Sequence, residues 1–558
     1  MLPAVQGPPA TDHGVRLGRR ALGDLLSRSW SRAGSAFVAV ARRPVLAIIV
    51  VFVATFGVAM ALRIAMGAAP PPVVHDELSY VLGAETFLHG RLTNPPHVMA
   101  RHFETFHVLH RPTYASKYPP ANALVIAAGW KLGGEPYVGV ALSFALMCAS
   151  LCWMLQRWIG RVLGFGLALV VGLNLAGTYW GTSYWGGAVA ASGGALVLGA
   201  AYRLLRAPSA PKAWPTACNA VVLALGLLVL ANSRPYEGLW FALPVMMVLL
   251  VHLVRRKPAS RMALLRSAVL PFLLVMAMGG GAMLAYNHAV TGRWSEMPYT
   301  AYAKASDPVP VFLWQGMPAH APPKDEVLRR FQEEGELQYT KARTLRGRAK
   351  FAYSALGFFP FLIPATVLFP FLLLPVLFRH RPTRLAAAAT VVMLFGMALT
   401  TYYFDHYAAA ATAAILAIYG ACLRLFGRLR LGQRRIGRPL TVAVLGVWAC
   451  VGLAHAAARV DKKRGKVGWP DHRQAIADSL ARRGSKNVVF VRYVEPHPTE
   501  SEWVFNSADI DASPVVWARD MGAENGELLN YYRDRSAWIV DVGSDTGPFP
   551  VRPYTAAP

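Results

Sequence analysis

The chain has 558 residues, of which 54% are hydrophobic and 16% charged, and its mean hydropathy is +0.34. Soluble domains are less apolar, and the long unalternating apolar runs exclude an outer-membrane barrel, so the composition predicts a polytopic α-helical membrane protein. Lys and Arg in cytoplasmic loops account for the net charge of +27, and no nucleic-acid partner is expected.

The N-terminal segment, residues 1–43, is rich in arginine and is expected to stay in the cytoplasm. The apolar run that follows, 44–66, is long enough to cross a bilayer. No short apolar core with a small-residue cleavage site is present, so this first span is predicted to be a retained signal anchor. A long outer loop, 67–136, then begins, and the short apolar stretch 121–132 near its end is predicted to lie at the interface.

About eleven spans are predicted in total. The ten after the first lie at about 137–156, 162–179, 187–203, 214–232, 237–254, 267–286, 352–378, 385–403, 407–423 and 439–457. From Arg157 onward, none of the five predicted cytoplasmic connections contains Asp or Glu, and every acidic residue after Asp24 falls on the outer side. This segregation supports the topology, because an error of one helix would break it.

The polar tail, residues 459–558, is predicted to form a small α/β domain in the periplasm. Strand-like runs at 487–493, 514–518 and 536–542 alternate with helical stretches at 473–482 and 525–532. The fold class is therefore a polytopic helical membrane domain, 44–458, with outer loops 67–136 and 287–350 and a C-terminal α/β domain. All five cysteines lie in apolar runs, and no disulfide is expected.

The predicted topology brings four polar clusters, far apart in the sequence, to one outer face. They are His75-Asp76-Glu77, Arg234-Pro235-Tyr236-Glu237, Asp405-His406-Tyr407, and the loop residues around Arg91, Lys117 and Arg293. Carboxylates at a membrane surface are costly to hold there unless they act on something. A carboxylate can deprotonate a hydroxyl, and arginine can hold phosphate oxygens, so the clusters suit a reaction on an anionic lipid-linked substrate.

These motifs resemble a known family. The Asp76-Glu77 pair after a first span, followed by Tyr80 and the stretch 83–90, is similar to the opening of GT-C glycosyltransferases, in the branch with protein mannosyltransferases and the lipid A aminoarabinose transferase. Lys117-Tyr118-Pro119-Pro120 resembles the end of the first loop in that group. The Arg234 and His406 motifs resemble later motifs of its bacterial members, and the resemblance covers about 44–425.

The resemblance implies an inverting transferase in the bacterial inner membrane that takes a sugar from a polyprenyl-phosphate donor on the extracytoplasmic face. The acceptor is left open between a glycan, a lipid and a protein. Asp76 then matches the catalytic carboxylate, with Glu77 beside it. The expected substrate-binding residues are Lys117, Tyr118, Arg234, Glu237, His406, Tyr407, Arg343 and Arg346.

Other interpretations of the same residues stay open at this point. Asp76 and Glu77 could cap a helix, and Arg234 and Glu237 could form a local i,i+3 ion pair. The first loop is rich in histidine, so a divalent-metal site is an alternative to a metal-free enzyme, with His75, His102 and His107 as candidate ligands.

The basic segment 341–350 contains Arg343 and Arg346 on the predicted outer side. It is predicted to form an amphipathic helix, either solvated or lying on the membrane, where it would attract the donor phosphate. Two other functions remain as alternatives: an O-antigen ligase or polymerase, and a lipid-linked glycan transporter. The early acidic pair disfavours the former, and the scarcity of ionisable residues in the spans disfavours the latter.

Overall fold

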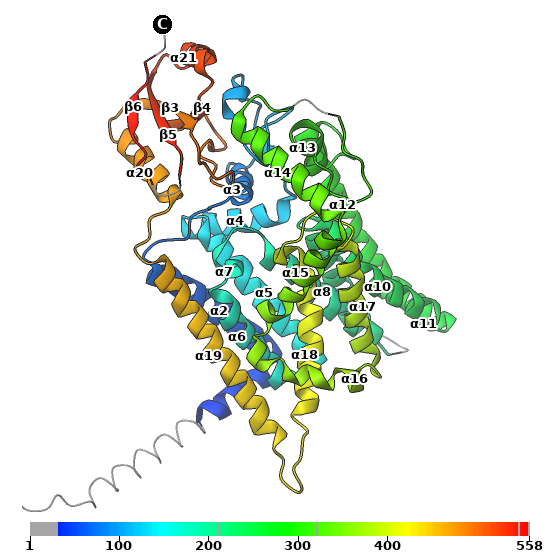
Figure 1. The fold of residues 1–558 in the computed structure, drawn as a ribbon. Coiled ribbons are helices and arrows are strands. Elements are labelled where there is room, and N and C mark those ends of the chain that lie inside the picture. Colours follow the sequence, from blue (N-terminus) through cyan, green and yellow to red (C-terminus); the bar gives the residue numbers. More distant parts are fainter. Residues whose placement is uncertain (1–31, 209–211, 320–321, 545–546, 556–558) are drawn as a thin grey trace, which may run out of the picture.

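The computed structural model describes residues 32–208, 212–319, 322–544 and 547–555, so most of the predicted cytoplasmic N-terminus lies outside the described residues. A bundle of long helices is covered at one end by short helices and a four-stranded sheet (Figure 1). The polytopic helical class with a C-terminal sheet is therefore confirmed.

Eight helices of the described chain are long and apolar enough to cross a membrane. They are α2 (Pro44–Met66), α5 (Tyr137–Trp158), α8 (Gly187–Leu205), α9 (Ala213–Ala231), α10 (Pro235–Val254), the continuous run from α11 (Pro258–Leu264) through a π-helical turn (Leu265–Val269) to α12 (Leu270–Thr291), α18 (Thr412–Phe426) with the 3-10 turns before it (Asp405–Ala411), and α19 (Gly437–Lys463). Each coincides with a predicted span, and this part of the chain is a multi-pass membrane protein.

The three remaining predicted spans differ from the expectation. Two become helices of only 16 and 17 residues, α6 (Arg161–Ala176) and α17 (Arg381–Met397). The predicted continuous span 352–378 is wrong, because α15 (Leu345–Leu362) ends before Pro364. The chain then continues through two 3-10 turns, Ala365–Val367 and Phe369–Leu373, into the short helix α16 (Leu374–Leu377). Each proline removes a backbone donor and disfavours helix at the preceding residue.

The end of the bundle that carries the sheet is built from the two large loops. The first loop supplies α3 (His75–Leu88), the hairpin strands β1 (Val108–Leu109) and β2 (Ala115–Ser116), a 3-10 turn (Ala100–Phe103) and α4 (Pro120–Gly133), while α7 (Tyr179–Thr182) lies beside them. The second loop supplies α13 (Pro298–Ser306) and α14 (Glu326–Ala342). The predicted interfacial segment is thus the 14-residue helix α4.

Glycines fix how the first loop sits on the bundle. A Cβ added at Gly129 of α4 would lie 2.2 Å from Cα of Gly139 in α5, so the two helix backbones touch. Only residues without a side chain allow helices to approach this closely. Because α4 packs in turn against α3, this crossing sets the height of the His75 end of α3 above the bundle.

The C-terminal region forms the strands and helices that the sequence predicts. Strands β3 (Lys486–Tyr493), β4 (Val515–Arg519) and β5 (Arg535–Val542) run parallel in the order β4-β3-β5, and β6 (Val551–Pro553) adds an antiparallel edge. Helix α20 (Trp469–Ala481) precedes β3, and a 3-10 turn (Gly522–Glu524) leads into α21 (Asn525–Tyr531). The connection from β3 to β4 contains no helix, whereas β4 leads through α21 to β5 on the other side of β3, so the predicted βαβ arrangement is present only in part.

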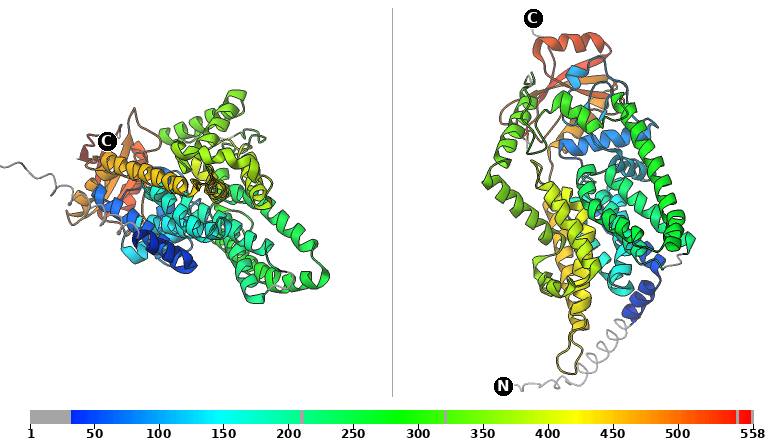
Figure 2. Two further views of the ribbon diagram at one scale, coloured as in Figure 1. Left: turned by 90° about the horizontal axis from the view of Figure 1, so that it is seen from below. Right: turned by 90° about the vertical axis from the view of Figure 1, so that its right-hand side faces the viewer.

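The sheet shares its core with the first loop. Leu82, Phe103 and Val108 pack with Phe490 and Val516 of the sheet, and Leu78 packs on its other face with Val489 and Trp503. Polar bonds join the same parts: Tyr114 donates to the Asn506 carbonyl at 3.0 Å, and the Ala508 N–H donates to Glu85 at 2.9 Å. The first loop and the C-terminal sheet therefore form one layer above the bundle (Figure 2).

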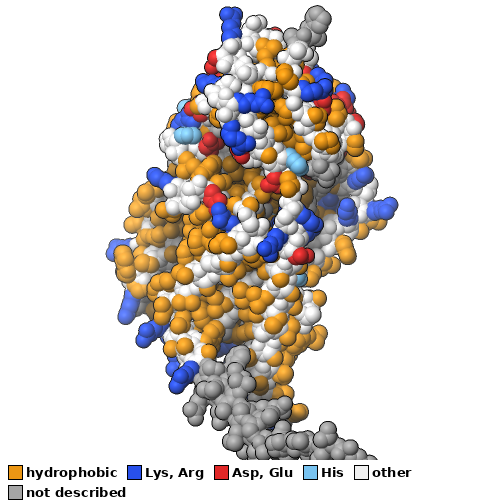
Figure 3. Space-filling model, turned by 90° about the vertical axis from the view of Figure 1, so that its left-hand side faces the viewer, with side chains coloured by type: hydrophobic (Ala, Val, Ile, Leu, Met, Phe, Trp, Pro, Cys, Tyr) orange, Lys and Arg blue, Asp and Glu red, His pale blue; other side chains and the backbone are white. Residues whose placement is uncertain are grey.

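The surface of the bundle differs in composition from the surface of the layer above it. Below this layer a broad hydrophobic face carries few charges, whereas charged side chains of both signs gather around the sheet (Figure 3). Exposed apolar residues of α2 and α12 contribute to the hydrophobic surface of the bundle: Val45, Ile49, Val53, Leu270, Leu273, Leu274 and Met278. Such a surface is stable in contact with lipid.

Candidate functional site

The first turn of α3 holds the acidic pair in two different environments. Glu77 is buried, and its Oε2 accepts hydrogen bonds from the N–H groups of Val73 (2.7 Å) and Val74 (3.3 Å). Its Oε1 accepts from the Tyr184 N–H at 2.9 Å, which ties α3 to the loop after α7. Burial raises the pKa of Glu77 to about 7, although the three N–H groups oppose the shift. Because both oxygens are engaged, Glu77 holds the helix in place.

Asp76 instead faces an open region, with 37% of its side chain exposed. The Tyr118 hydroxyl donates to its Oδ1, and Tyr118 stacks on Tyr80 with ring centroids 4.4 Å apart. His107 Nε2 lies 3.5 Å from Oδ1, and His75 Nδ1 lies 3.6 Å from Oδ2. Asp76 is thus a fixed carboxylate at a surface that a substrate can reach, which is what a general base requires.

Two buried histidines flank Asp76. The rings of His75 and His107 meet edge to face at 4.4 Å, and one ligand atom from each of His75, Asp76 and His107 lies within 4.8 Å of the other two. Burial lowers the pKa of both imidazoles, and Lys117 lowers that of His107 further. Both rings are therefore neutral near pH 7, the form that binds metal ions. These three residues could hold a metal ion.

Lys117 is buried at the end of the same loop. Its Nζ lies 4.7 Å from the ring centroid of Tyr302 and 5.0 Å from that of Tyr299, both in α13. No described carboxylate lies within 4.0 Å of the ammonium group, so the aromatic faces are its main neighbours. Burial lowers the pKa of Lys117, while Asp307 and Asp76 raise it.

Arg234 is contributed to the site by the helical bundle. It precedes the first turn of α10, and its guanidinium lies 4.5 Å from the ring centroid of Tyr407. Burial alone lowers the pKa of Arg234, but Tyr80, Tyr407, Glu237 and Asp76 raise it. The alternative of a local Arg234–Glu237 ion pair is not met, because no carboxylate of the described residues forms an ion pair with the guanidinium.

Glu237 and His406 are both buried and do not face the open region beside Asp76. Glu237 is buried in the first turn of α10. His406 is buried among aromatic rings, with centroid distances of 4.8 Å to Trp185 and 4.8 Å to Tyr407. His406 thus supports Tyr407, the residue on which Arg234 stacks.

Helix α14 of the second loop covers the histidines. Phe331 packs on His75 at 5.2 Å, on His107 at 5.7 Å and on Phe106 at 4.6 Å, measured between ring centroids. The same helix is fastened to the C-terminal sheet region: Arg330 pairs with Glu495 and bonds the His497 carbonyl, and Thr499 donates to Glu334 at 2.9 Å. We therefore refer to α14 as the roof of the site.

Three of the predicted residues lie outside this constellation. His102 Nε2 is 3.2 Å from the Glu524 carbonyl oxygen, in the interface with the C-terminal region. Arg343 and Arg346 are exposed where α14 ends and α15 begins. The predicted single helix over 341–350 is wrong, because the chain leaves the α14 axis at Arg343 and Thr344 starts a new helix as its N-cap.

Sequence reasoning missed Tyr299, Tyr302 and Phe331. These residues lie 223 to 255 positions after Asp76, and nothing in their local pattern distinguishes them from core aromatics. The spacing of Tyr299 and Tyr302 does place both on one helix face, toward Lys117.

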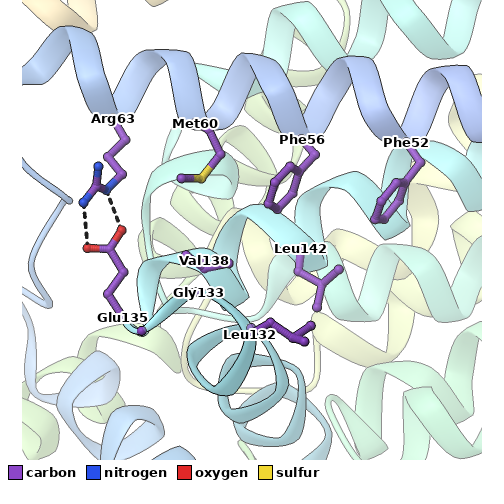
Figure 4. Close-up of a pocket in the computed structure, with 11 residues that line it drawn as sticks. Phe52, Phe56, Met60, Arg63, Leu132, Gly133, Glu135, Val138 and Leu142 are labelled. Carbon is purple, nitrogen blue, oxygen red and sulfur yellow. Dashed lines mark hydrogen bonds and ion pairs between the residues drawn. The ribbon is translucent and has the colours of Figure 1, made fainter.

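Two cavities lie near these elements. A polar cavity of about 240 Å³ adjoins the roof, between residues 104–110, α13 and α14, and is lined in part by Glu104, Asp307 and Gln332. A larger one, of about 670 Å³, lies between α2 and the α4–α5 junction. It is apolar apart from Arg63 and Glu135, which pair at 2.5 Å at one end (Figure 4). Asp76, Lys117 and Arg234 do not line the larger cavity, and its two charged lining residues pair with each other.

Comparison with solved structures finds similar chains in one superfamily. The apo structure of ArnT from Cupriavidus metallidurans matches over 91% of this chain and 93% of its own, with 13% identity and a TM-score of 0.48. ArnT bound to undecaprenyl phosphate matches over 89% and 92%, with 14% identity and a TM-score of 0.49. The apo oligosaccharyltransferase of Archaeoglobus fulgidus matches over 88% and 69%, with 11% identity and a TM-score of 0.42.

Both neighbours are GT-C superfamily members, the group that the first-loop motifs resemble. No family model matches the chain, and no curated protein matches it. TM-scores below 0.5 and identities this low assign no activity, so function is inferred from the residues themselves.

Proposed function

We propose that this protein is an extracytoplasmic membrane glycosyltransferase that moves a sugar from a polyprenyl-phosphate donor to an acceptor hydroxyl. The observation that carries the proposal is one arrangement at the outer end of the bundle. A half-exposed carboxylate, Asp76, stands among two cations, Lys117 and Arg234, that lack carboxylate partners within the described chain.

The cations suit the phosphate of a lipid donor. Arg234 lies at the N-terminus of the spanning helix α10, where the headgroup of a membrane-anchored carrier would lie. Backbone N–H groups and the helix dipole at this end favour an anion, and a guanidinium can bind two phosphate oxygens at once. Stacking on Tyr407 holds the guanidinium plane in position.

The reaction then needs one displacement. Asp76 accepts the proton of the acceptor hydroxyl, whose oxygen forms a bond to the anomeric carbon of the donor sugar. The bond from that carbon to the phosphate oxygen breaks, and its electron pair leaves with the polyprenyl phosphate, which Lys117 and Arg234 stabilise. A single attack from the opposite face inverts the anomeric configuration.

In this mechanism the other predicted residues position these groups. Tyr118 orients Asp76 by hydrogen bonding, Glu77 fixes the start of α3, and His406 supports Tyr407. We propose that Arg343 and Arg346, exposed on the same loop, attract the anionic donor before it binds. The outer face is the extracytoplasmic side, with the N-terminus in the cytoplasm and the C-terminal sheet in the periplasm.

The proposal is tested with purified protein in detergent, where no membrane compartments exist. A radiolabelled sugar on undecaprenyl phosphate is incubated with candidate acceptors, and sugar transfer is measured together with release of the lipid phosphate. We expect both to appear with equal stoichiometry. Failure with every acceptor, together with donor translocation in proteoliposomes, would establish a transporter instead. Transfer of only a preassembled glycan would establish the ligase alternative.

A further inference from the structure

The larger cavity is a groove along one face of α2. Four side chains of α2 at helical spacing point toward the α4–α5 junction: Phe52, Phe56, Met60 and Arg63 (Figure 4). The facing wall is formed by α4 and α5 and includes Leu132, Val138 and Leu142. Apart from the Arg63–Glu135 ion pair the lining is apolar, so the groove suits a hydrocarbon chain. We refer to it as the α2 groove.

The α2 groove extends over one leaflet of a bilayer. Arg63 lies 11 positions after Phe52, which corresponds to a helical rise of about 16 Å. The hydrocarbon core of a bilayer is about 30 Å thick, so the groove covers about half of it. Because Arg63 lies in the last turn of α2, this is the half nearer the C-terminal sheet. The charged end of the groove therefore lies at the level of the lipid headgroups.

The α2 groove is open on the side that faces the lipid. Leu132 at its rim is 81% exposed, so a chain can enter sideways from the membrane. Apolar walls without a neighbouring atom lose their dispersion contacts, and water does not replace these contacts in an apolar space. At this depth in a bilayer the available filler is a lipid chain.

The ion pair at the end of the groove has free hydrogen-bonding capacity. Arg63 binds Glu135 from Nε at 2.5 Å and from Nη2 at 3.0 Å. No described residue bonds its Nη1, which leaves a donor for a phosphate oxygen. Each Glu135 carboxylate oxygen keeps a second lone-pair site, which can accept from an ammonium group. With side chains 32% and 27% exposed, both residues can be reached by a headgroup.

We propose that the α2 groove binds one chain of a glycerophospholipid with an ethanolamine headgroup, taken from the leaflet on the side of the sheet. The phosphate accepts from Arg63, and the primary ammonium group donates to Glu135. A choline headgroup has no N–H to donate, and a glycerol headgroup carries no cation. Only the ethanolamine headgroup therefore matches both members of the ion pair.

The bound lipid would support the helix beneath the candidate site. Leu132 and Gly133 of α4 line the groove, and α4 packs against α3, which carries Asp76. Lipid contacts along α4 therefore stabilise the packing of the first loop on the bundle. This lipid site is independent of the proposed transferase activity, because it uses neither Asp76 nor the two cations beside it.

The experiment counts bound lipids by native mass spectrometry. Full-length protein is delipidated in detergent and titrated with dioleoyl phosphatidylethanolamine, phosphatidylcholine or phosphatidylglycerol. We expect one phosphatidylethanolamine per chain and about 10-fold weaker binding of the other two lipids. Met60→Trp fills the groove and should weaken phosphatidylethanolamine binding about 10-fold, at unchanged thermal stability of the lipid-free protein. Leu239→Trp, at an exposed apolar position of α10, is the matched control and should bind as the wild type does.

Two substitutions test the headgroup contacts separately. Glu135→Gln keeps an acceptor oxygen but removes the charge, so it should abolish the preference for ethanolamine over choline. Arg63→Gln should weaken the binding of both lipids, whereas Arg293→Gln, at an exposed arginine, should change neither.

Three results would overturn the lipid site. The first is equal binding of the three phospholipids by the wild type, and the second is wild-type binding by Met60→Trp. The third is stoichiometric displacement of phosphatidylethanolamine by undecaprenyl phosphate, which would assign the groove to a polyprenyl carrier instead. None of these measurements depends on sugar transfer, so failure of the lipid site and failure of the proposed function are distinguishable.

Discussion

Arg519 in the C-terminal sheet donates a hydrogen bond from Nη1 to Asp325 Oδ1 at 3.0 Å, and Asp325 is the N-cap of the roof helix α14. The same oxygen accepts from the Val327 and Leu328 N–H groups. Arg519 is 2% exposed and is also bonded to Glu502 at 2.6 Å and to the Glu104 carbonyl. One guanidinium therefore joins the sheet, the first loop and the roof that carries Phe331.

Because Arg519 holds the start of α14, a substitution at Asp325 should affect the site although Asp325 does not touch Asp76. Asp325→Asn keeps an oxygen acceptor for the helix cap but removes the charge that pairs with Arg519. Losing a charge-assisted bond of about 1.5–3 kcal/mol should loosen α14 and lower kcat/KM about 10-fold. Hydrogen exchange should become faster in α14, and Asp478→Asn, at an exposed aspartate of α20, should change neither quantity. Unchanged exchange in α14 would show that the bond does not hold the roof.

Glu77 predicts a pH dependence of stability. Its pKa is about 7 in the folded protein, above the ordinary 4.5, so the folded state binds more protons between these values. Stability therefore falls as pH rises through that window, by up to about 3 kcal/mol in total. Thermal unfolding in detergent from pH 5 to 8 should show a smaller fall for Glu77→Gln than for the wild type. The exposed Glu500→Gln should follow the wild type, and identical slopes for Glu77→Gln would rule out this titration.

Arg234 predicts a defect in donor binding. Arg234→Lys keeps the charge but loses the planar group stacked on Tyr407, and Arg234→Gln loses both. We expect the Kd for undecaprenyl phosphate to rise about 10-fold in the first variant and about 100-fold in the second, as expected for charge-assisted bonds to phosphate. The exposed Arg293→Gln is the control. Wild-type affinity in Arg234→Gln would remove Arg234 from the phosphate site.

Substitutions at Arg343 and Arg346 should change the KM for donor in a salt-dependent way. Both are exposed, so they can attract the donor only through long-range charge. The double variant Arg343→Glu, Arg346→Glu should raise the KM for donor several-fold at low ionic strength, and the difference from the wild type should shrink at about 0.5 M salt. The attraction would be contradicted if the KM for donor of the double variant equalled that of the wild type, or if the difference between them did not depend on salt.

The fold was largely accessible from the sequence because its signals are local. Apolar length marks the spans, and β-branched runs such as 487–493 mark the sheet. The broken segment 352–378 was misjudged because its composition stays apolar while prolines at 364, 370 and 375 interrupt the helix. Average hydropathy does not register that interruption.

The candidate site was accessible only in part. Asp76, Lys117 and Arg234 were identified because each follows or precedes an apolar run or belongs to a resembling motif. The separation of roles between Asp76 and Glu77 required three-dimensional information, since only the fold brings the Tyr184 N–H to Glu77. His102 and His107 are indistinguishable in the sequence, and only the fold places His107 beside Asp76 and His102 beside the Glu524 carbonyl.

The central claim is that Asp76 is the catalytic carboxylate, and Asp76→Asn tests it most directly. The substitution keeps the shape of the side chain and removes the base. Single-turnover transfer from a labelled undecaprenyl-phosphate sugar should fall about 10²- to 10⁴-fold, while the Kd for undecaprenyl phosphate and the thermal stability stay within about twofold of the wild type. Wild-type transfer by Asp76→Asn would contradict the mechanism.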